Sequence, residues 1–213
     1  ASEQQHFLLP KHAIKHLIQV QRLSEGDEFI AIESDSLKHF CRLIKVKKQQ
    51  VLFVIESSEE IEPASQKMKP FITLVQAMIK PGPFSLVLQK CTELGVQRII
   101  PLLSTRSQNL GRRPQDFNLE RWQKILRESG QQSGQISLPV ISPPVNGLEE
   151  LPMIKERDQV YLFAHSSPQS MPIKQILSRY QSASESFTIL IGPEGGWTDQ
   201  EALWARQKGM YMV

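Results

Sequence analysis

The chain contains 213 residues, 40% of them apolar, which is enough for one large folded domain or two small ones. No run approaches the roughly 18 consecutive apolar residues of a membrane span, and residues 1–12 lack the basic-then-apolar order of a secretory signal, so we expect a cytoplasmic protein. The two cysteines, Cys41 and Cys91, have no C-x-x-C spacing, which disfavours a disulfide framework or a zinc site.

The charge distribution is compatible with a nucleic-acid partner without requiring one. The formal net charge is +3; residues 1–68 carry nine basic and ten acidic side chains, and residues 69–213 carry sixteen and twelve. Five basic residues cluster between Lys38 and Lys48. This cluster indicates either a surface that contacts nucleic acid or a strand edge protected by lysines.

Residues 1–68 predict a small antiparallel β-domain. Helical spacing of apolar residues over 12–23 leads into a turn, and three period-two segments follow, at 28–32, 38–46 and 50–56. The histidines of this segment show no metal-binding spacing, so no metal site is predicted. Residues 57–70 are rich in Ser, Glu, Lys and Pro and predict a linker, with the domain boundary at residue 68.

Beyond the linker, the pattern changes to buried strands that alternate with helices. Residues 71–79 and 96–103 are nearly continuously apolar, as expected of strands covered on both faces. Helical spacing between them is shown by Phe84, Val87, Leu88, Cys91 and Leu94. Gly95 occupies the position of a helix C-terminal cap. This βαβ unit predicts an α/β domain with parallel strands.

The remaining segments continue the α/β pattern. Asn118 is predicted to cap a helix that ends at Gly134. Further predicted strands are 138–141, 160–164, 187–191 and 210–213, and further helical segments are 147–151, 171–180 and 198–208. The polar loop 104–115 is either a phosphate-contacting loop or a solvated one.

Residues 187–198, FTILIGPEGGWT, combine an apolar strand, a glycine loop and a helix start. Thr198 and Glu201 have the spacing of a capping box. Glycines permit close backbone approach and a helix start presents unpaired N–H groups, so the junction suits a small polar ligand; an ordinary strand-to-helix turn explains it equally well. The first α/β strand is not followed by G-x-G-x-x-G, which argues against an ordinary dinucleotide or Rossmann-type methyltransferase site.

Several short stretches share their order and spacing with one known family over about residues 75–209. They are Leu88-Gln89-Lys90, Thr92-Glu93-Leu94-Gly95-Val96, Pro101-Leu102, Arg106-Ser107, Trp122-Gln123-Lys124-Ile125, Gln132-Ser133-Gly134 and Leu190-Ile191-Gly192-Pro193-Glu194-Gly195-Gly196. Through them the chain resembles the RsmE family. Members of this family are SPOUT-class enzymes that transfer methyl from S-adenosylmethionine to N3 of a uridine in 16S ribosomal RNA of the small subunit.

The resemblance implies a PUA-like RNA-binding β-barrel at residues 1–68 and a parallel-sheet, trefoil-knot methyltransferase domain at residues 69–213. It further implies a homodimer that acts on 16S rRNA or on the small ribosomal subunit, without a metal or a membrane. Two alternatives stay open: another SPOUT RNA methyltransferase with a different target, and a non-catalytic RNA-binding module.

The same resemblance assigns the cofactor contacts to the ends of two strands. The residues are Leu162, Phe163, Ala164, His165, Ile191, Gly192, Pro193, Glu194, Gly195 and Gly196. Glu194 is interpreted either as a ligand of the cofactor or as a carboxylate favoured by the following helix dipole. Trp197 either shields the cofactor pocket from solvent or only packs in the protein core.

Methylation at uracil N3 requires removal of a proton or stabilisation of the anion that results. Within the matching motifs, Glu93 is the candidate base and Arg106 the candidate partner of the anion or of a phosphate. Alternatively, Glu93 is a surface residue at a helix end, and Arg106 only anchors a phosphate. Expected RNA contacts are Arg22, Lys38, Arg42, Lys45, Lys80, Lys90, Arg112 and Arg113.

The sequence departs from the family pattern at three places. Gln135 stands where arginine is usual, and Thr105 precedes Arg106 where glutamate is usual, which puts RNA contacts there in doubt. The family continues past Gly209 through a segment that completes the cofactor pocket, threads the knot and contributes to the dimer, whereas this sequence stops at Val213. A chain that truly ended there is expected to be unknotted and to bind the cofactor poorly.

Overall fold

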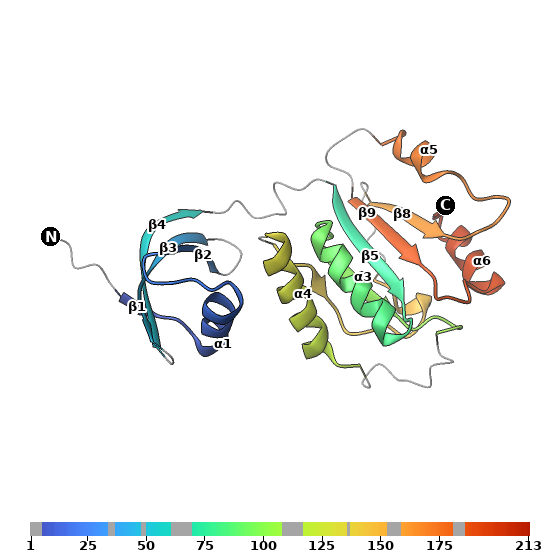
Figure 1. Cartoon of the computed structure of the whole chain (residues 1–213). Helices are drawn as coiled ribbons and strands as arrows, with labels where there is room; N and C mark the ends of the chain where they lie inside the picture. The colour runs from blue at the N-terminus through green and yellow to red at the C-terminus, as the bar shows by residue number, and fades with distance from the viewer. Residues whose placement is uncertain are drawn as a thin grey trace. The chain divides into compact units, whose positions relative to one another are not determined.

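The structure is a computed structural model that describes residues 6–33, 37–47, 50–60, 70–107, 117–135, 137–152, 159–180 and 186–213. The chain divides into two compact units, Ala1–Pro63 and Ala64–Val213 (Figure 1). No helix in the described part of the chain is long and apolar enough to cross a membrane.

The first unit is a four-stranded antiparallel sheet in the order β1-β4-β3-β2. Its strands are β1 (His6–Leu8), β2 (Glu28–Glu33), β3 (Leu37–Lys47) and β4 (Gln50–Glu60). Helix α1 (Lys11–Ile14) and the π-helical turn η1 (Lys15–Val20) follow β1. The three predicted strands and the preceding helical segment are therefore confirmed.

One correction concerns the predicted linker, because Ser57–Glu60 belong to β4. These four residues pair with Leu37–Phe40 of β3, and polar cross-strand contacts compensate for their lack of apolar side chains. Lys38 Nζ donates to Glu59 at 2.8 Å, and the His39 ring lies 2.7 Å from the Ser58 hydroxyl. Residues 61–69, including the predicted boundary, lie outside the described residues.

The second unit contains a six-stranded parallel sheet in the order β10-β8-β9-β5-β6-β7. Its strands are β5 (Phe71–Ala77), β6 (Arg98–Leu102), β7 (Val140–Ile141), β8 (Gln159–Ala164), β9 (Ser186–Ile191) and β10 (Tyr211–Met212). All the strands predicted for this half of the chain are present. The α/β prediction is confirmed.

Helices cover both faces of this sheet, which is why its central strands are almost continuously apolar. Side by side on one face lie α3 (Pro81–Glu93) and α4 (Leu119–Ser133), which share a core with Ile99 (Figure 1). The short α5 (Ile173–Leu177) packs on Val160, Leu162 and Phe187. The opposite face is covered by α6 (Asp199–Gln207) and the 3-10 turn η4 (Leu148–Glu150), packed on residues such as Ile100.

Helix ends follow their predicted capping residues. Asn118 accepts a hydrogen bond from Arg121 N at the start of α4, and Gly134 ends that helix in the left-handed region with φ +69°. Gly95 has φ +76° beyond the end of α3. Leu94, predicted to face the core, is instead 77% exposed because α3 ends one residue earlier.

Both cysteine thiols are free; Cys41 is buried in the first unit, and Cys91 packs against the apolar core beneath α3. Burial raises the pKa of the Cys91 thiol to about 11 and also raises the pKa of Cys41. Both thiols are therefore expected to stay protonated at neutral pH, as residues that serve packing do.

Leu88→Ala should lower the free energy of unfolding of the second unit by about 2–5 kcal/mol, because Leu88 is 0% exposed between α3 and the sheet. Leu86→Ala on the same helix is the control, since Leu86 is 54% exposed and should change stability by less than about 0.5 kcal/mol. All three tryptophans of the chain lie after residue 120, so tryptophan fluorescence during urea unfolding reports on this unit. Equal losses in the two variants would contradict the packing described.

Candidate functional site

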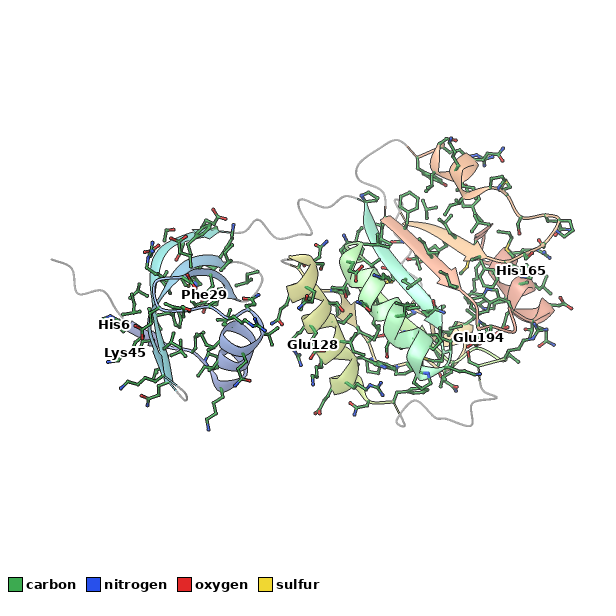
Figure 2. The ribbon with its side chains drawn as sticks, in the orientation of Figure 1. His6, Phe29, Lys45, Glu128, His165 and Glu194 are labelled. Atoms are coloured by element: carbon green, nitrogen blue, oxygen red, sulfur yellow. The ribbon has the colours of Figure 1, made fainter. Side chains whose placement is uncertain are left out.

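The carboxyl ends of the parallel strands meet at one edge of the sheet. β8 pairs with β9, β9 with β5, and β5 with β6, so the loops that follow these four strands are neighbours. Figure 2 shows His165, after β8, and Glu194, after β9, at the arrowhead end of the strands. We call this edge, with the loops that follow β5, β6, β8 and β9, the carboxyl edge. Ligands of open α/β sheets bind at such an edge.

The structure brings together the two segments predicted to contact a cofactor. Ala164, near the end of β8, pairs directly with Ile191 at the end of β9. Leu162 and Phe163 are 1% and 0% exposed, so their side chains belong to the core. The backbone of these two residues pairs with β9 on one side and β10 on the other, so the predicted ligand contacts of β8 narrow to its end. Ala164 and His165 are partly exposed at the carboxyl edge.

Trp197 is a packing residue that shapes the glycine loop. Its indole Nε1 donates to the Ala164 carbonyl at 2.9 Å, and its ring packs on Phe163 with centroids 4.6 Å apart. Only 4% of Trp197 is exposed. A Cβ on Gly192 would lie 3.0 Å from Trp197 Nε1, which explains the glycine at that position. Of the two interpretations of Trp197, packing is therefore the one observed.

Arg106 reaches the glycine loop from the loop after β6. Its guanidinium Nη1 donates to the Gly195 carbonyl, and a Cβ on Gly195 would lie 3.3 Å from Arg106 Cδ. Arg106 is itself exposed. A guanidinium that is exposed beside a close-packed glycine loop can contact an anionic group of a ligand held there.

Buried hydroxyls and one carboxylate tie the loops of the carboxyl edge together. Ser107 Oγ donates to the Met78 carbonyl at 2.8 Å and lies 2.8 Å from Ser104 Oγ. Thr105 N donates to a carboxylate oxygen of Glu201 at 2.9 Å. Sequence reasoning did not single out Ser104, quoted Ser107 only within a family motif, and recognised Glu201 only as part of a capping box.

Glu194 and Lys80 are both exposed at the carboxyl edge. Lys80 N lies 3.5 Å from Glu194 Oε1, a long and weak contact, so the carboxylate stays available to a ligand. Both earlier interpretations of Glu194 are compatible with this position.

Glu93, the predicted base, lies at the opposite edge of the sheet. It is the last residue of α3, and a helix that joins two parallel strands runs back to their amino ends. Lys90 Nζ donates to its carboxylate at 2.7 Å, and Gln135 Nε2 donates to its carbonyl at 3.1 Å. Within one chain, Glu93 therefore does not meet Arg106, and its role as a base stays a prediction.

Several of the predicted RNA-binding cations are paired with carboxylates. Arg42 bonds Glu56 at 2.6 Å and Glu28 at 2.7 Å, and the Glu56 contact raises the pKa of Arg42 and lowers that of Glu56. Lys38 and Lys90 pair with Glu59 and Glu93, as described above. Arg22, Lys45 and Lys80 are exposed, and Figure 2 marks Lys45 on the first unit. Arg112 and Arg113 lie outside the described residues.

His, Cys, Asp and Glu side chains in the described ranges form no cluster of three or more that could hold a metal ion.

The architecture defines a class of protein. A parallel sheet with a glycine-rich strand-to-helix loop but no dinucleotide fingerprint, joined to a separate antiparallel β-unit, is the plan of a SPOUT-type RNA methyltransferase. Residues 66–213 match the family model of an RNA methyltransferase domain, and residues 9–56 match that of an RNA methyltransferase PUA domain. The chain belongs to this RNA methyltransferase family, and its resemblance to RsmE proteins is confirmed.

Characterised relatives align over most of the chain. Ribosomal RNA small subunit methyltransferase E of Bacillus subtilis is 28% identical over 200 residues, which are 92% of this chain and 76% of the relative. The protein of the same name from Synechocystis is 27% identical over 94% of this chain and 63% of its own length. The chain thus spans only part of each relative.

Solved structures show the same fold. Ribosomal RNA small subunit methyltransferase E from Neisseria gonorrhoeae, bound to S-adenosyl methionine, aligns with a TM-score of 0.77 and 26% identity over 100% of this chain and 84% of its own. A putative methyltransferase of Legionella pneumophila, in complex with bound SAM, aligns with a TM-score of 0.79 and 26% identity over 98% and 83% of the two chains.

Gly192→Ala should displace Trp197, because the added Cβ would lie 3.0 Å from its indole nitrogen. We expect a loss of about 1–3 kcal/mol in unfolding free energy, together with a shift of tryptophan emission as the bond to Ala164 weakens. Gly82→Ala is the matched control, since its Cβ would meet nothing within 4 Å. Thermal unfolding followed by fluorescence measures both, and an unchanged Gly192→Ala protein would contradict the role given to Trp197.

Proposed function

We propose that this chain transfers a methyl group from S-adenosylmethionine to N3 of a uridine in the 16S rRNA of the small ribosomal subunit. One observation carries the proposal: the end of β8, the glycine loop after β9 and Arg106 converge at the carboxyl edge of a methyltransferase fold. Relatives with this fold are named small subunit rRNA methyltransferases, and two solved ones hold the cofactor.

The chain offers the cofactor mainly backbone groups. S-adenosylmethionine would supply an activated methyl group, so the protein has chiefly to bind and orient the two reactants. The end of β8 at Ala164 and His165 and the loop Ile191–Gly196 would hold it, with Glu194 as an exposed carboxylate for its ribose or amine. Neutral N–H and C=O groups at strand ends suit an adenine, which needs no phosphate cradle.

Arg106 would act on the acceptor. Uracil N3 carries a proton at neutral pH, and its loss spreads negative charge over the neighbouring carbonyl oxygens. An exposed guanidinium held beside the glycine loop is placed to stabilise that charge, or to hold a phosphate of the same nucleotide. The proposal gives no role to Glu93 of the same chain, because Glu93 lies at the edge of the sheet opposite the carboxyl edge.

The proposal also covers how the protein contacts RNA and in which assembly state it acts. We infer that RNA contacts come chiefly from the exposed Arg22, Lys45 and Lys80, because Lys38, Arg42 and Lys90 already have carboxylate partners. A homodimer in the cytoplasm, which the family resemblance implies, completes the proposal.

Titration of the protein with S-adenosylmethionine in a calorimeter should show saturable binding at micromolar levels. Incubation with 16S rRNA or with small subunits, followed by mass spectrometry of nucleoside digests, should then place a new methyl group on uridine N3. Methylation of another atom would indicate a related methyltransferase with a different target. Absence of cofactor binding would favour a non-catalytic RNA-binding module.

Arg106→Ala should reduce kcat by about 100-fold or more, the usual effect of removing a donor that stabilises developing charge. Cofactor affinity should fall less than kcat, because Trp197 still ties the glycine loop to the Ala164 carbonyl when Arg106 is removed. Glu93→Gln tests the prediction of Glu93 as a base; because Glu93 lies at the other edge of the sheet, this variant should leave kcat unchanged. Single-turnover assays on RNA measure both variants; a normal Arg106→Ala enzyme with an inactive Glu93→Gln enzyme would reverse the two assignments.

A further inference from the structure

The carboxylate of Glu201 is buried between two loops of the carboxyl edge. Glu201 is 8% exposed, and the ion pairs found in the described part of the chain do not include it. Its charge is satisfied by neutral donors. One oxygen, Oε2, accepts from Thr198 N at 2.7 Å and from Thr198 Oγ1 at 2.9 Å. The other, Oε1, accepts from Thr105 N at 2.9 Å.

A capping box accounts for only one of these oxygens. The reciprocal bonds between Thr198 and Glu201 begin α6, and they need Oε2 together with the Thr198 hydroxyl, which accepts from Glu201 N at 3.2 Å. Oε1 instead reaches a loop that lies 96 residues earlier in the chain. The bond to Thr105 therefore has no role in capping α6.

Thr105 is the residue immediately before Arg106. The guanidinium of Arg106 donates to the Gly195 carbonyl, and Gly195 precedes the Thr198 cap by three residues. Glu201 thus holds the backbone of the Arg106 loop on one side and the end of the glycine loop on the other. Bonds to an ionised acceptor are about twice as strong as neutral ones, so this carboxylate is well suited to fix the distance between the loops.

We propose that Glu201 is a positioning residue, which acts through the Thr105 amide to hold Arg106 against the glycine loop during methyl transfer. This inference rests on the proposed function. The far side of the Arg106 loop has separate anchors, since Ser107 Oγ bonds the Met78 carbonyl at 2.8 Å and Ser107 N bonds the Ser104 carbonyl at 2.9 Å. Loss of Glu201 should therefore shift Arg106 without unfolding the loop.

The test compares Glu201→Asp and Glu201→Ala with Thr198→Ala. Thr198→Ala removes the capping hydroxyl but leaves Oε1 bonded to Thr105, so it measures the effect of capping alone. Glu201→Asp keeps the charge near Thr198 but is one methylene too short to bond Thr105 as well. All three variants should unfold at a lower temperature than the wild type, and Glu201→Ala should do so by the largest amount, because it loses the bond to Thr105 N as well as the capping bonds.

Only the Glu201 variants should lose turnover. We expect kcat to fall about 10- to 100-fold, the effect of misplacing a reacting group by about 1 Å, while the Kd for S-adenosylmethionine stays within about twofold. Hydrogen exchange of a peptide containing Thr105 should accelerate in both Glu201 variants and stay protected in Thr198→Ala. This exchange measurement needs no substrate and no activity.

Two results would overturn the positioning role alone: full turnover in Glu201→Asp with an active wild type, or equal turnover loss in Glu201→Ala and Thr198→Ala. An unchanged hydrogen-exchange rate at Thr105 in the Glu201→Ala variant would refute the hydrogen bond between Thr105 N and Glu201. A wild-type protein that binds the cofactor but methylates no RNA would instead refute the proposed function. The hydrogen-exchange result would still test the contact between Glu201 and Thr105, because it does not depend on activity.

Discussion

Parallel pairing of β8, β9, β5 and β6 is the constraint on which the candidate site depends. Parallel strands all end at the same edge, so loops that are far apart in the sequence are brought together there. The glycine loop after β9 thereby meets Ala164 from β8 and Arg106 from the loop after β6. The same rule sends the end of α3, and with it Glu93, to the amino edge of the sheet.

Hydrogen bonds between loops then turn this edge into one rigid surface. A loop that is partly buried must find partners for its backbone groups, and here the partners lie on neighbouring loops. Trp197 bonds the Ala164 carbonyl, Arg106 the Gly195 carbonyl, Ser107 the Met78 carbonyl and Glu201 the Thr105 amide. Four loops are therefore held by side chains. Methyl transfer from an activated cofactor depends largely on such positioning.

In the antiparallel unit, part of the basic cluster that suggested a nucleic-acid surface is paired with acidic side chains. Arg42 lies between Glu28 and Glu56, and Lys38 faces Glu59, so two of the five cations in the cluster pair with carboxylates on neighbouring strands. Such exposed pairs contribute little to stability, but they reduce the positive field that would attract RNA. Exposed cations such as Lys45 and Lys80 consequently become the more important candidates for phosphate contact.

The sequence by itself determined the features whose signals are local. Apolar periodicity identified the βαβ unit, and Asn118 and Thr198 marked helix starts. The glycine loop and Arg106 were singled out as candidate site residues through the family resemblance, and those roles stay predictions. Only the tertiary structure decided which residues share an edge, that Ser57–Glu60 extend a strand, and that Glu201 bonds Thr105. These depend on contacts between residues distant in the chain, which periodicity and capping rules do not encode, because both describe a residue and its near neighbours.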